Sequence, residues 1–250
     1  MRGVAAANPI RQFLACRAHL GAPLALLHKA ARSLPPLRPL AELASQGLGL
    51  YTDARGRAFD RAHGTDTFFR VPMKELGLRD PRGADFDNWA YGPIGPDFFH
   101  EMMRPIPDRG ELTFFDVGSG KGLPLMLAGD HGFRRVVGIE LSRDLCDLAQ
   151  RNFARYAAST GKPVAAEVLC GDFMEHELPD EPTVFFLNNP FPHYLATHAV
   201  AHIEASIRRH PRRVVLAYRR MQLPTLRQLE ASPLLALHLS TPYWQIFATR

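Results

Sequence analysis

A tight glycine-rich turn near the middle of the chain constrains the fold more than any other feature. A mostly apolar run, Phe114–Val117, contains Asp116 near its end and is followed by the turn Gly118-Ser119-Gly120-Lys121-Gly122. The helix-compatible segment Leu123–Ala128 follows this turn at once. A strand, a glycine turn and a helix in this order bring backbone amides close to a ligand, because glycine has no side chain to keep the ligand away. The turn therefore predicts a ligand site at the end of a strand.

A regular alternation of apolar runs and helical segments surrounds this turn. The runs are short, mostly apolar and rich in β-branched or aromatic residues, and they lie at Leu112–Val117, Arg135–Leu141, Ala165–Cys170, Thr183–Asn188 and Arg213–Tyr218. Segments of helical period separate them, above all Ser142–Ala158 and Pro192–His210. Strands buried on both faces and alternating with helices predict an α/β fold with an open, mostly parallel sheet and helices on both faces. Leu234–Ser240 and Tyr243–Thr249 add a terminal hairpin.

The first part of the chain lacks this rhythm. Prolines interrupt residues 1–50, where Pro39–Ala44 can start a short helix, and residues 51–90 are polar and predict a long irregular loop. We therefore expect a mainly helical or irregular extension over residues 1–88 and one α/β domain over residues 89–250. Pro96 and Asp97 suit the first turn of a short amphipathic helix that ends near Arg104.

Composition favours a reducing, cytoplasmic setting and leaves the charge open to two interpretations. The three cysteines are too few and too scattered to predict a disulfide framework, and no CxxC pair suggests zinc. We expect Cys146 to be a packing residue. The sequence has no apolar run long enough to span a bilayer. The net charge of +5 suits an anionic partner such as nucleic acid. We favour an arginine-rich bacterial coding bias as the explanation, because nearly all the basic residues are arginine.

The spacing of the glycines excludes two common nucleotide loops. A Walker loop requires Ser or Thr after Gly-Lys, but Gly122 follows Lys121, and Phe115 stands where its first glycine would fall. A dinucleotide loop requires a glycine at its sixth position, which is Leu123 here. Lys121 itself is expected to point to solvent.

The pattern Asp-x-Gly-x-Gly-x-Gly at Asp116–Gly122 resembles motif I of the class I S-adenosylmethionine-dependent methyltransferases. The resemblance covers about residues 89–250 and implies a Rossmann-like sheet of seven strands in the order 3-2-1-4-5-7-6, with strand 7 antiparallel. It also implies that Asp116 and the glycine backbone hold the amino-acid end of the cofactor, with the acid on the ammonium group.

Two further acids strengthen this resemblance. Glu140 ends the next predicted strand, 22 positions after Gly118, where a carboxylate can accept both ribose hydroxyls. Gly171-Asp172-Phe173 ends the third strand, where the family places an acid near the adenine amino group and an apolar side chain against its ring. The residues expected at the cofactor are Tyr91, Asp116, Gly118, Ser119, Gly120, Gly122, Glu140, Leu141, Asp172, Phe173 and Asn188.

The expected reaction centre is Asn188-Asn189-Pro190-Phe191, at the end of the fourth strand. It resembles the Asn/Asp-Pro-Pro-Tyr/Phe element of adenine and glutamine N-methyltransferases but differs at the second position. It also resembles the Asn-Asn-Phe element of the histone lysine methyltransferases that lack a SET domain. An asparagine oxygen can accept a hydrogen bond from an amine and direct its lone pair at the methyl group, and Phe191 can stack on a flat or cationic substrate.

These features predict an S-adenosylmethionine-dependent methyltransferase that needs no metal and methylates an amine nitrogen, such as that of a protein lysine. A protein or small-molecule amine is the favoured acceptor and RNA is possible; the alternatives are an RNA or DNA adenine N-methyltransferase and a non-catalytic S-adenosylmethionine-binding module. The chain also resembles uncharacterised bacterial methyltransferase-like proteins. We expect no membrane partner, and the sequence leaves the oligomeric state open.

Overall fold

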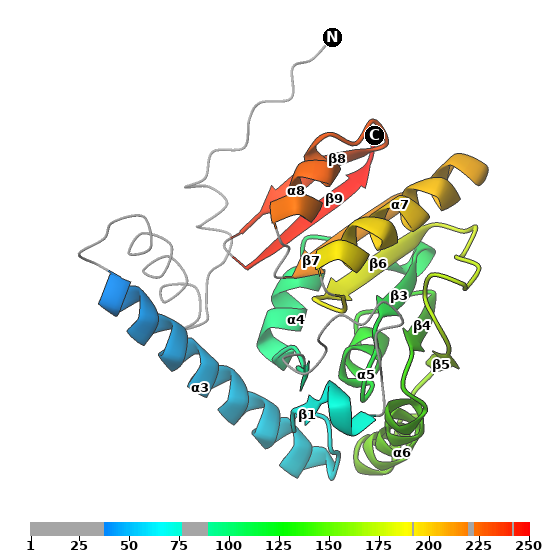
Figure 1. The fold of residues 1–250 in the computed structure, drawn as a ribbon. Coiled ribbons are helices and arrows are strands. Elements are labelled where there is room, and N and C mark those ends of the chain that lie inside the picture. The colour runs from blue at the N-terminus through cyan, green and yellow to red at the C-terminus, as the bar shows by residue number, and fades with distance from the viewer. Residues whose placement is uncertain (1–37, 77–89, 192, 220–222, 242) are drawn as a thin grey trace. The chain divides into compact units, whose positions relative to one another are not determined.

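The computed structural model describes residues 38–76, 90–191, 193–219, 223–241 and 243–250 (Figure 1). The chain divides between Ala54 and Arg55 into two compact units. The predicted boundary between residues 88 and 89 lies outside the described residues and stays a prediction, as does the organisation of residues 1–37.

The long helix α3, Arg38–His63, shows that the prediction of an irregular segment from residue 51 was wrong for residues 51–63. Gly49 and Gly56 weaken the helical signal in the sequence. The structure gives Gly56 a packing reason, because a side chain there would collide with the Phe68 ring, whose nearest atom is 1.9 Å from the position of a Cβ. Glycine at this point of the helix lets the following segment fold back against it.

The second unit, Arg55–Arg250, contains a seven-stranded sheet in the order β5-β4-β3-β6-β7-β9-β8. Its strands are β3 (Thr113–Val117), β4 (Arg135–Glu140), β5 (Glu167–Cys170), β6 (Thr183–Asn188), β7 (Val214–Arg219), β8 (Leu235–Ser240) and β9 (Trp244–Thr249). Numbered along the chain, this order is 3-2-1-4-5-7-6, and the last strand, β9, pairs antiparallel with both neighbours. The predicted fold class, strand order and terminal hairpin are confirmed.

Five helices of this unit lie within the described residues beside the end of α3. They are α4 (Pro96–Met103), α5 (Leu123–Gly129), α6 (Arg143–Thr160), α7 (His193–Arg209) and α8 (Leu223–Glu230). The first four confirm helical segments predicted from the sequence, whereas α8 was not predicted. The short strands β1 (Val71–Pro72) and β2 (Ala90–Tyr91) pair with each other, and the described residues also include the single turns η2 (Met73–Leu76) and η4 (Arg109–Glu111).

Helices cover both faces of the sheet because the central strands carry apolar side chains on both sides. Phe115 and Val117 of β3 belong to a core cluster with Ile203 of α7 and Leu229 of α8. Phe114, which alternates with them, meets Phe99 of α4 on the opposite face. Figure 1 shows α7 and α8 (yellow and orange) together over the strands β6–β9. The carboxyl ends of the parallel strands remain the edge at which loops gather.

Candidate active site

The predicted site segments follow neighbouring parallel strands and meet at one edge of the sheet. β3 lies between β4 and β6, with Val117 opposite both Ile139 and Leu187. The glycine turn, Glu140 and Asn188 come at the carboxyl ends of these three strands. Open α/β sheets bind their ligands at this edge, so the topology itself assembles the predicted site.

The glycine turn adopts a backbone that favours glycine at all three motif positions. Gly118, Gly120 and Gly122 have φ values of 74°, 53° and 84°, in the left-handed region that side chains with a Cβ disfavour. Close packing adds a second constraint at Gly118, where a Cβ would lie 2.8 Å from Cβ of Pro190. The spacing of the glycines is therefore required both by the turn and by the approach of the β6 loop.

Glu140 connects the glycine turn with the start of α6 through hydrogen bonds. Its buried carboxylate accepts hydrogen bonds from the amide of Gly120 at 2.8 Å and from the amide of Ser142 at 2.9 Å. Burial raises the carboxyl pKa, and these two backbone hydrogen bonds oppose that rise. Each carboxylate oxygen keeps a further lone pair, so Glu140 can hold the loop and still accept ribose hydroxyls.

Asp116 is buried at the end of β3 with an unsatisfied carboxylate oxygen. Its Oδ2 has no hydrogen-bond partner among the described residues, and the same holds for Oγ of the neighbouring Ser119. Burial raises the pKa of Asp116 well above its ordinary value, and the charge of Glu140 raises it further. A buried carboxyl oxygen without a hydrogen-bond partner is costly. An ammonium group would supply the missing charge, which is what the amino-acid end of S-adenosylmethionine offers.

The predicted adenine side lies beside Glu140. The amide of Gly171 donates to the carbonyl oxygen of Glu140 at 3.0 Å, which brings the end of β5 next to β4. Leu141 exposes 53% of its surface there, and the exposed Asp172 accepts a hydrogen bond from the amide of Met174. Phe173 is buried in the core cluster. An exposed leucine and an acid suit a planar base with an amino group, and their role stays a prediction.

Asn188 is held from both sides at the end of β6. Its Nδ2 donates to the carbonyl oxygen of Gly92 at 3.0 Å, and its Oδ1 accepts from Nη1 of Arg219 at 2.9 Å. A guanidinium only donates and a carbonyl only accepts, so these two partners fix which end of the Asn188 amide is the oxygen. They also connect Asn188 with the segment after Tyr91, whose backbone pairs with Val71 in β1 and β2.

The chain turns sharply after Asn188. Asn189 has a φ of 54°, a left-handed conformation that asparagine tolerates better than most residues. This turn places Pro190 against Gly118, while the partly buried Phe191 packs at 5.8 Å from the Phe173 ring. The sequence element Asn188–Phe191 therefore lies directly beside the glycine turn.

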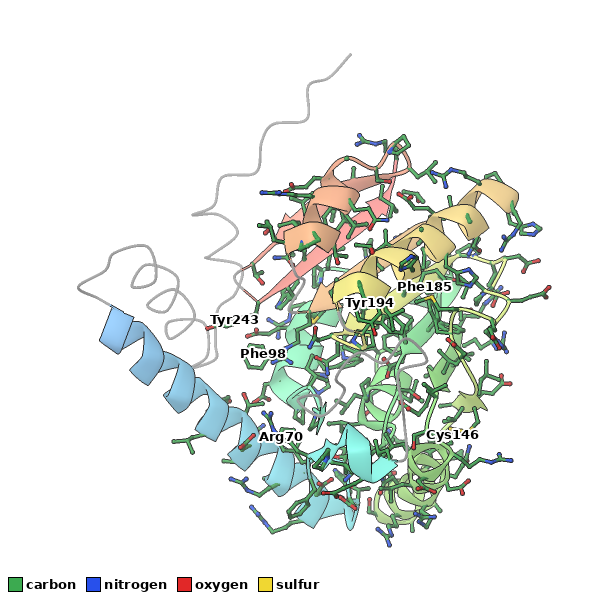
Figure 2. All side chains as sticks on the ribbon, in the orientation of Figure 1. Arg70, Phe98, Cys146, Phe185, Tyr194 and Tyr243 are labelled. Atoms are coloured by element: carbon green, nitrogen blue, oxygen red, sulfur yellow. A yellow bond between two sulfur atoms is a disulfide. The ribbon has the colours of Figure 1, made fainter. Side chains whose placement is uncertain are left out.

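Arg219 is a site residue that the sequence analysis missed. It ends β7 opposite Asn188, is buried, and holds its guanidinium 5.4 Å from the centre of the Phe98 ring. Phe98 of α4 in turn contacts Tyr243, as Figure 2 shows. In the sequence Arg219 directly follows the apolar run Arg213–Tyr218 among several other arginines, and nothing in its neighbours indicated a buried position.

Lys121 and Cys146 correct two smaller expectations. Lys121 does not point to solvent, because its side chain is 2% exposed and its Nζ lies 2.9 Å from a carboxylate oxygen of Asp66. Cys146 of α6 forms a disulfide with Cys170 of β5, although the sequence analysis expected no disulfide. The two cysteines are 24 positions apart, and only the fold brings them together.

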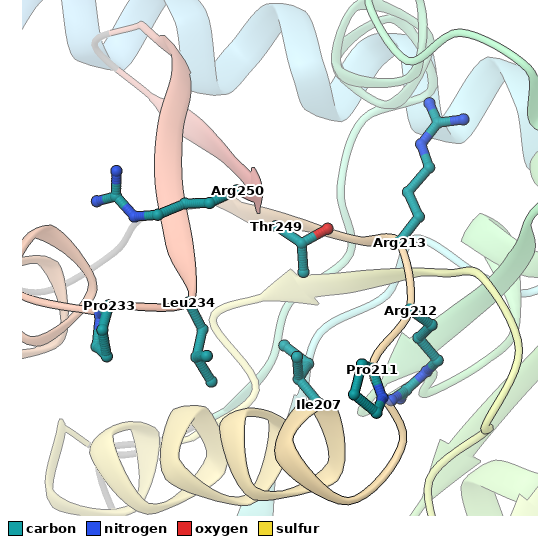
Figure 3. Close-up of a pocket in the computed structure, with 8 residues that line it drawn as sticks. All are labelled: Ile207, Pro211, Arg212, Arg213, Pro233, Leu234, Thr249 and Arg250. Carbon is teal, nitrogen blue, oxygen red and sulfur yellow. The ribbon is translucent and has the colours of Figure 1, made fainter.

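A pocket of about 470 Å³ lies away from this site. Its lining comes from the segments before β7 and β8 and the end of β9, so it opens at the amino ends of the parallel strands. The guanidinium groups of Arg212, Arg213 and Arg250 point in different directions there (Figure 3). They do not converge on one anion, and the site remains at the carboxyl edge.

A comparison with protein families agrees with a ligand site at this edge of the sheet. The family model described as "Histone methylation protein DOT1" matches residues 78–216, more than half of the chain. The chain belongs to this family. It is accordingly an S-adenosylmethionine-dependent methyltransferase, and the match includes the glycine turn, Glu140 and Asn188. The unsatisfied Oδ2 of Asp116 and the carboxylate of Glu140 fit the ammonium group and the ribose of that cofactor.

Solved structures with similar folds share little sequence with this DOT1-family protein. Magnesium protoporphyrin IX methyltransferase from Synechocystis PCC 6803 with bound SAM is 15% identical, with a TM-score of 0.47 over 62% of this chain and 76% of that one. An RNA methyltransferase from Salinibacter ruber in complex with S-adenosyl-L-homocysteine is 19% identical, with a TM-score of 0.44 over 63% and 92%. A predicted N6-adenine-specific DNA methylase from Listeria monocytogenes is 11% identical, with a TM-score of 0.49 over 63% and 51%.

No curated protein matches the chain. Within the part of the chain that the structure describes, no helix combines the length and the apolar composition needed to cross a membrane.

Proposed function

We propose that this methyltransferase transfers the methyl group to an amine nitrogen of a protein side chain, with lysine as the leading acceptor. The observation that carries the proposal is the fixed amide of Asn188 beside the glycine turn. The description of its family, histone methylation, supports a protein acceptor. Histones themselves are one example of such a protein, and the proposal extends to any accessible lysine that this edge of the sheet accommodates.

The proposed chemistry needs alignment more than a strong base. S-adenosylmethionine supplies a methyl group on a sulfonium, and the incoming amine must approach in line with the bond that breaks. Oδ1 of Asn188 accepts one hydrogen bond from Arg219 and has a second lone pair available. An N–H of a neutral amine can donate to this lone pair, which would orient the nitrogen lone pair toward the methyl group.

Replacement of Asn188 tests this role. We expect Asn188→Ala to lower methyl transfer at least about 100-fold, the usual effect of losing a positioned polar group in an active site, and to change the Kd for S-adenosylmethionine less than about threefold. Asn188→Asp is the matched variant, because it keeps an oxygen for Arg219 and loses the donor to Gly92. Equal losses of cofactor binding and methyl transfer in Asn188→Ala would contradict a role in the acceptor site.

Adenine in RNA or DNA is the second candidate, because Asn188, Pro190 and Phe191 match three positions of the element that adenine N-methyltransferases carry. Tritiated S-adenosylmethionine and a cell lysate separate the two. Protein methylation predicts label that protease removes and nuclease does not, with methyl-lysine in the hydrolysed protein. Nuclease-sensitive label would instead support the adenine function. Cofactor binding without label in any fraction would support a non-catalytic module.

A further inference from the structure

The segment Asp60–Pro72 lies upstream of the family match at residues 78–216, yet it contacts the glycine turn. It begins in the last turn of α3 and runs to the end of β1. Its sequence indicates only a polar loop. Its contacts connect it to both ends of the candidate active site.

Hydrogen bonds to Asp60 hold this segment in a compact turn. Its carboxylate accepts hydrogen bonds from the amides of Thr67 and Phe68 and from the hydroxyl groups of Thr65 and Thr67, at 2.7–3.0 Å. Thr67 is fully buried, and Phe68 packs against Gly56 of α3. The turn therefore has a defined shape before it meets the glycine loop.

Asn152 of α6 joins this turn to the glycine loop. Its Oδ1 accepts from the amide of Asp66 at 2.9 Å, and its Nδ2 donates to the carbonyl oxygens of Asp66 and Lys121, each at 3.0 Å. The side chain is completely buried. One amide thus uses its oxygen and both hydrogens to hold the two segments in register.

Lys121 makes a second connection from within the glycine loop. It is almost fully buried, and it pairs with Asp66, whose side chain is 42% exposed. Burial of a lysine is rare and gains little stability even when the charge is paired. Such a pair can instead define one arrangement of two segments. Here it fixes the peptide between Gly120, which Glu140 holds, and Gly122.

The other end of the segment reaches the acceptor side. Val71 pairs with Tyr91 between β1 and β2, and the next residue, Gly92, accepts the hydrogen bond from Asn188. One segment upstream of the family match is therefore attached both to the loop that holds the cofactor and to the strand end that carries Asn188.

We propose that Asp60–Pro72 positions the glycine loop for S-adenosylmethionine, and that Lys121 and Asp66 are the positioning residues. Neither side chain needs to touch the cofactor; their pair holds the loop backbone that does. The proposal concerns cofactor binding and stands whichever amine receives the methyl group.

Calorimetric titration with S-adenosylmethionine, well below the melting temperature of every variant, tests the proposal. Lys121→Met and Asp66→Ala should each raise the Kd about tenfold, and the double variant should be no weaker than the weaker single one, because both changes remove the same pair. Lys121→Arg should stay within about threefold of the wild type. Arg135→Met, which removes an exposed pair with Glu167 at the start of β4, is the control and should leave the Kd unchanged.

Hydrogen exchange supplies a second readout. S-adenosylmethionine should slow exchange at the amides of residues 66–68 in the wild type, and this protection should shrink in Asp66→Ala. Kd values within twofold of the wild type for Asp66→Ala or for folded Lys121→Met would overturn the proposal, as would effects that multiply in the double variant. If Lys121→Met does not fold, Asp66→Ala and the exchange measurement decide the question by themselves.

Discussion

Asp116 is a buried acid whose charge state should change when the proposed cofactor ammonium group lies beside it. In the folded protein its pKa is raised, because burial and Glu140 both disfavour the charged form. An ammonium group beside it would favour the charged form. If the ammonium group of S-adenosylmethionine lies beside Asp116, as we propose, binding should remove a proton from Asp116 over the pH range below its raised pKa.

This linkage predicts a pH-dependent affinity. As the pH falls through the raised pKa of Asp116, the wild-type Kd for S-adenosylmethionine should rise, because binding must then displace a proton. Asp116→Asn should bind about 100-fold more weakly at high pH, the loss expected when a charged hydrogen bond is removed, and should lose the pH dependence. Calorimetry from pH 5 to pH 9 measures both, and an Asp116→Asn variant with the wild-type profile would contradict the role.

Asp116 also predicts how stability changes with pH. The pKa of Asp116 is higher in the folded than in the unfolded protein. Its contribution to the free energy of unfolding is therefore fully present below the unfolded pKa of 3.8. That contribution is lost as the pH rises through the folded pKa. The free energy of unfolding of the cofactor-free wild type, relative to Asp116→Asn, should therefore fall with rising pH by at most about 1.4 kcal/mol per unit. Urea unfolding of both proteins measures it, and a rise would contradict the assignment.

Sequence patterns located some site residues and not others. The glycine spacing and the strand-end acids indicated Asp116 and Glu140, because those patterns follow from backbone geometry. Arg219 and Lys121 were missed because a basic residue in a sequence is normally read as exposed. Their burial follows from partners 31 and 55 positions away, Asn188 and Asp66.

At the scale of elements, the pattern of apolar residues predicted the strands of the sheet better than the helix α3 outside it. The strands β3, β4, β6 and β7 are buried on both faces, and their apolar runs mark them. The helix α3 was underestimated because its glycine at position 56 is needed for tertiary packing against Phe68. A helix that depends on such a contact carries a weak signal in its own sequence.

The disulfide is a contact between elements that the sequence could not indicate. It joins α6 to the end of β5, beside the strand end of Glu140, which pairs with Cys170. A disulfide over this separation stabilises a folded protein by about 3 kcal/mol, because it lowers the conformational entropy of the unfolded chain. Reducing agent should therefore lower the melting temperature of the wild type.

The double variant Cys146→Ser, Cys170→Ser is the control for this prediction. It should melt at the lower temperature with or without reducing agent. Calorimetric melting of both proteins under oxidising and reducing conditions measures the difference. A wild-type melting temperature that does not respond to reduction, together with a double variant of the same stability, would contradict a stabilising disulfide.

At the scale of the whole molecule, the residues of the candidate cofactor site lie together within the unit Arg55–Arg250. The sheet brings the glycine turn, Glu140 and Asn188 to one edge, and the segment upstream of the family match is attached to both sides of it. The net charge of +5 is spread over 30 basic and 25 acidic residues. Charge alone therefore does not choose between a protein and a nucleic acid as the acceptor.

The central claim is that this edge of the sheet binds S-adenosylmethionine through Glu140. Calorimetric titration of wild type, Glu140→Ala and the surface control Glu167→Ala tests it most directly. We predict micromolar affinity for the wild type and for Glu167→Ala. Glu140→Ala should bind about 100-fold more weakly or worse, because it loses hydrogen bonds to a charged group. No binding by the wild type, or equal binding by wild type and Glu140→Ala, would contradict the claim.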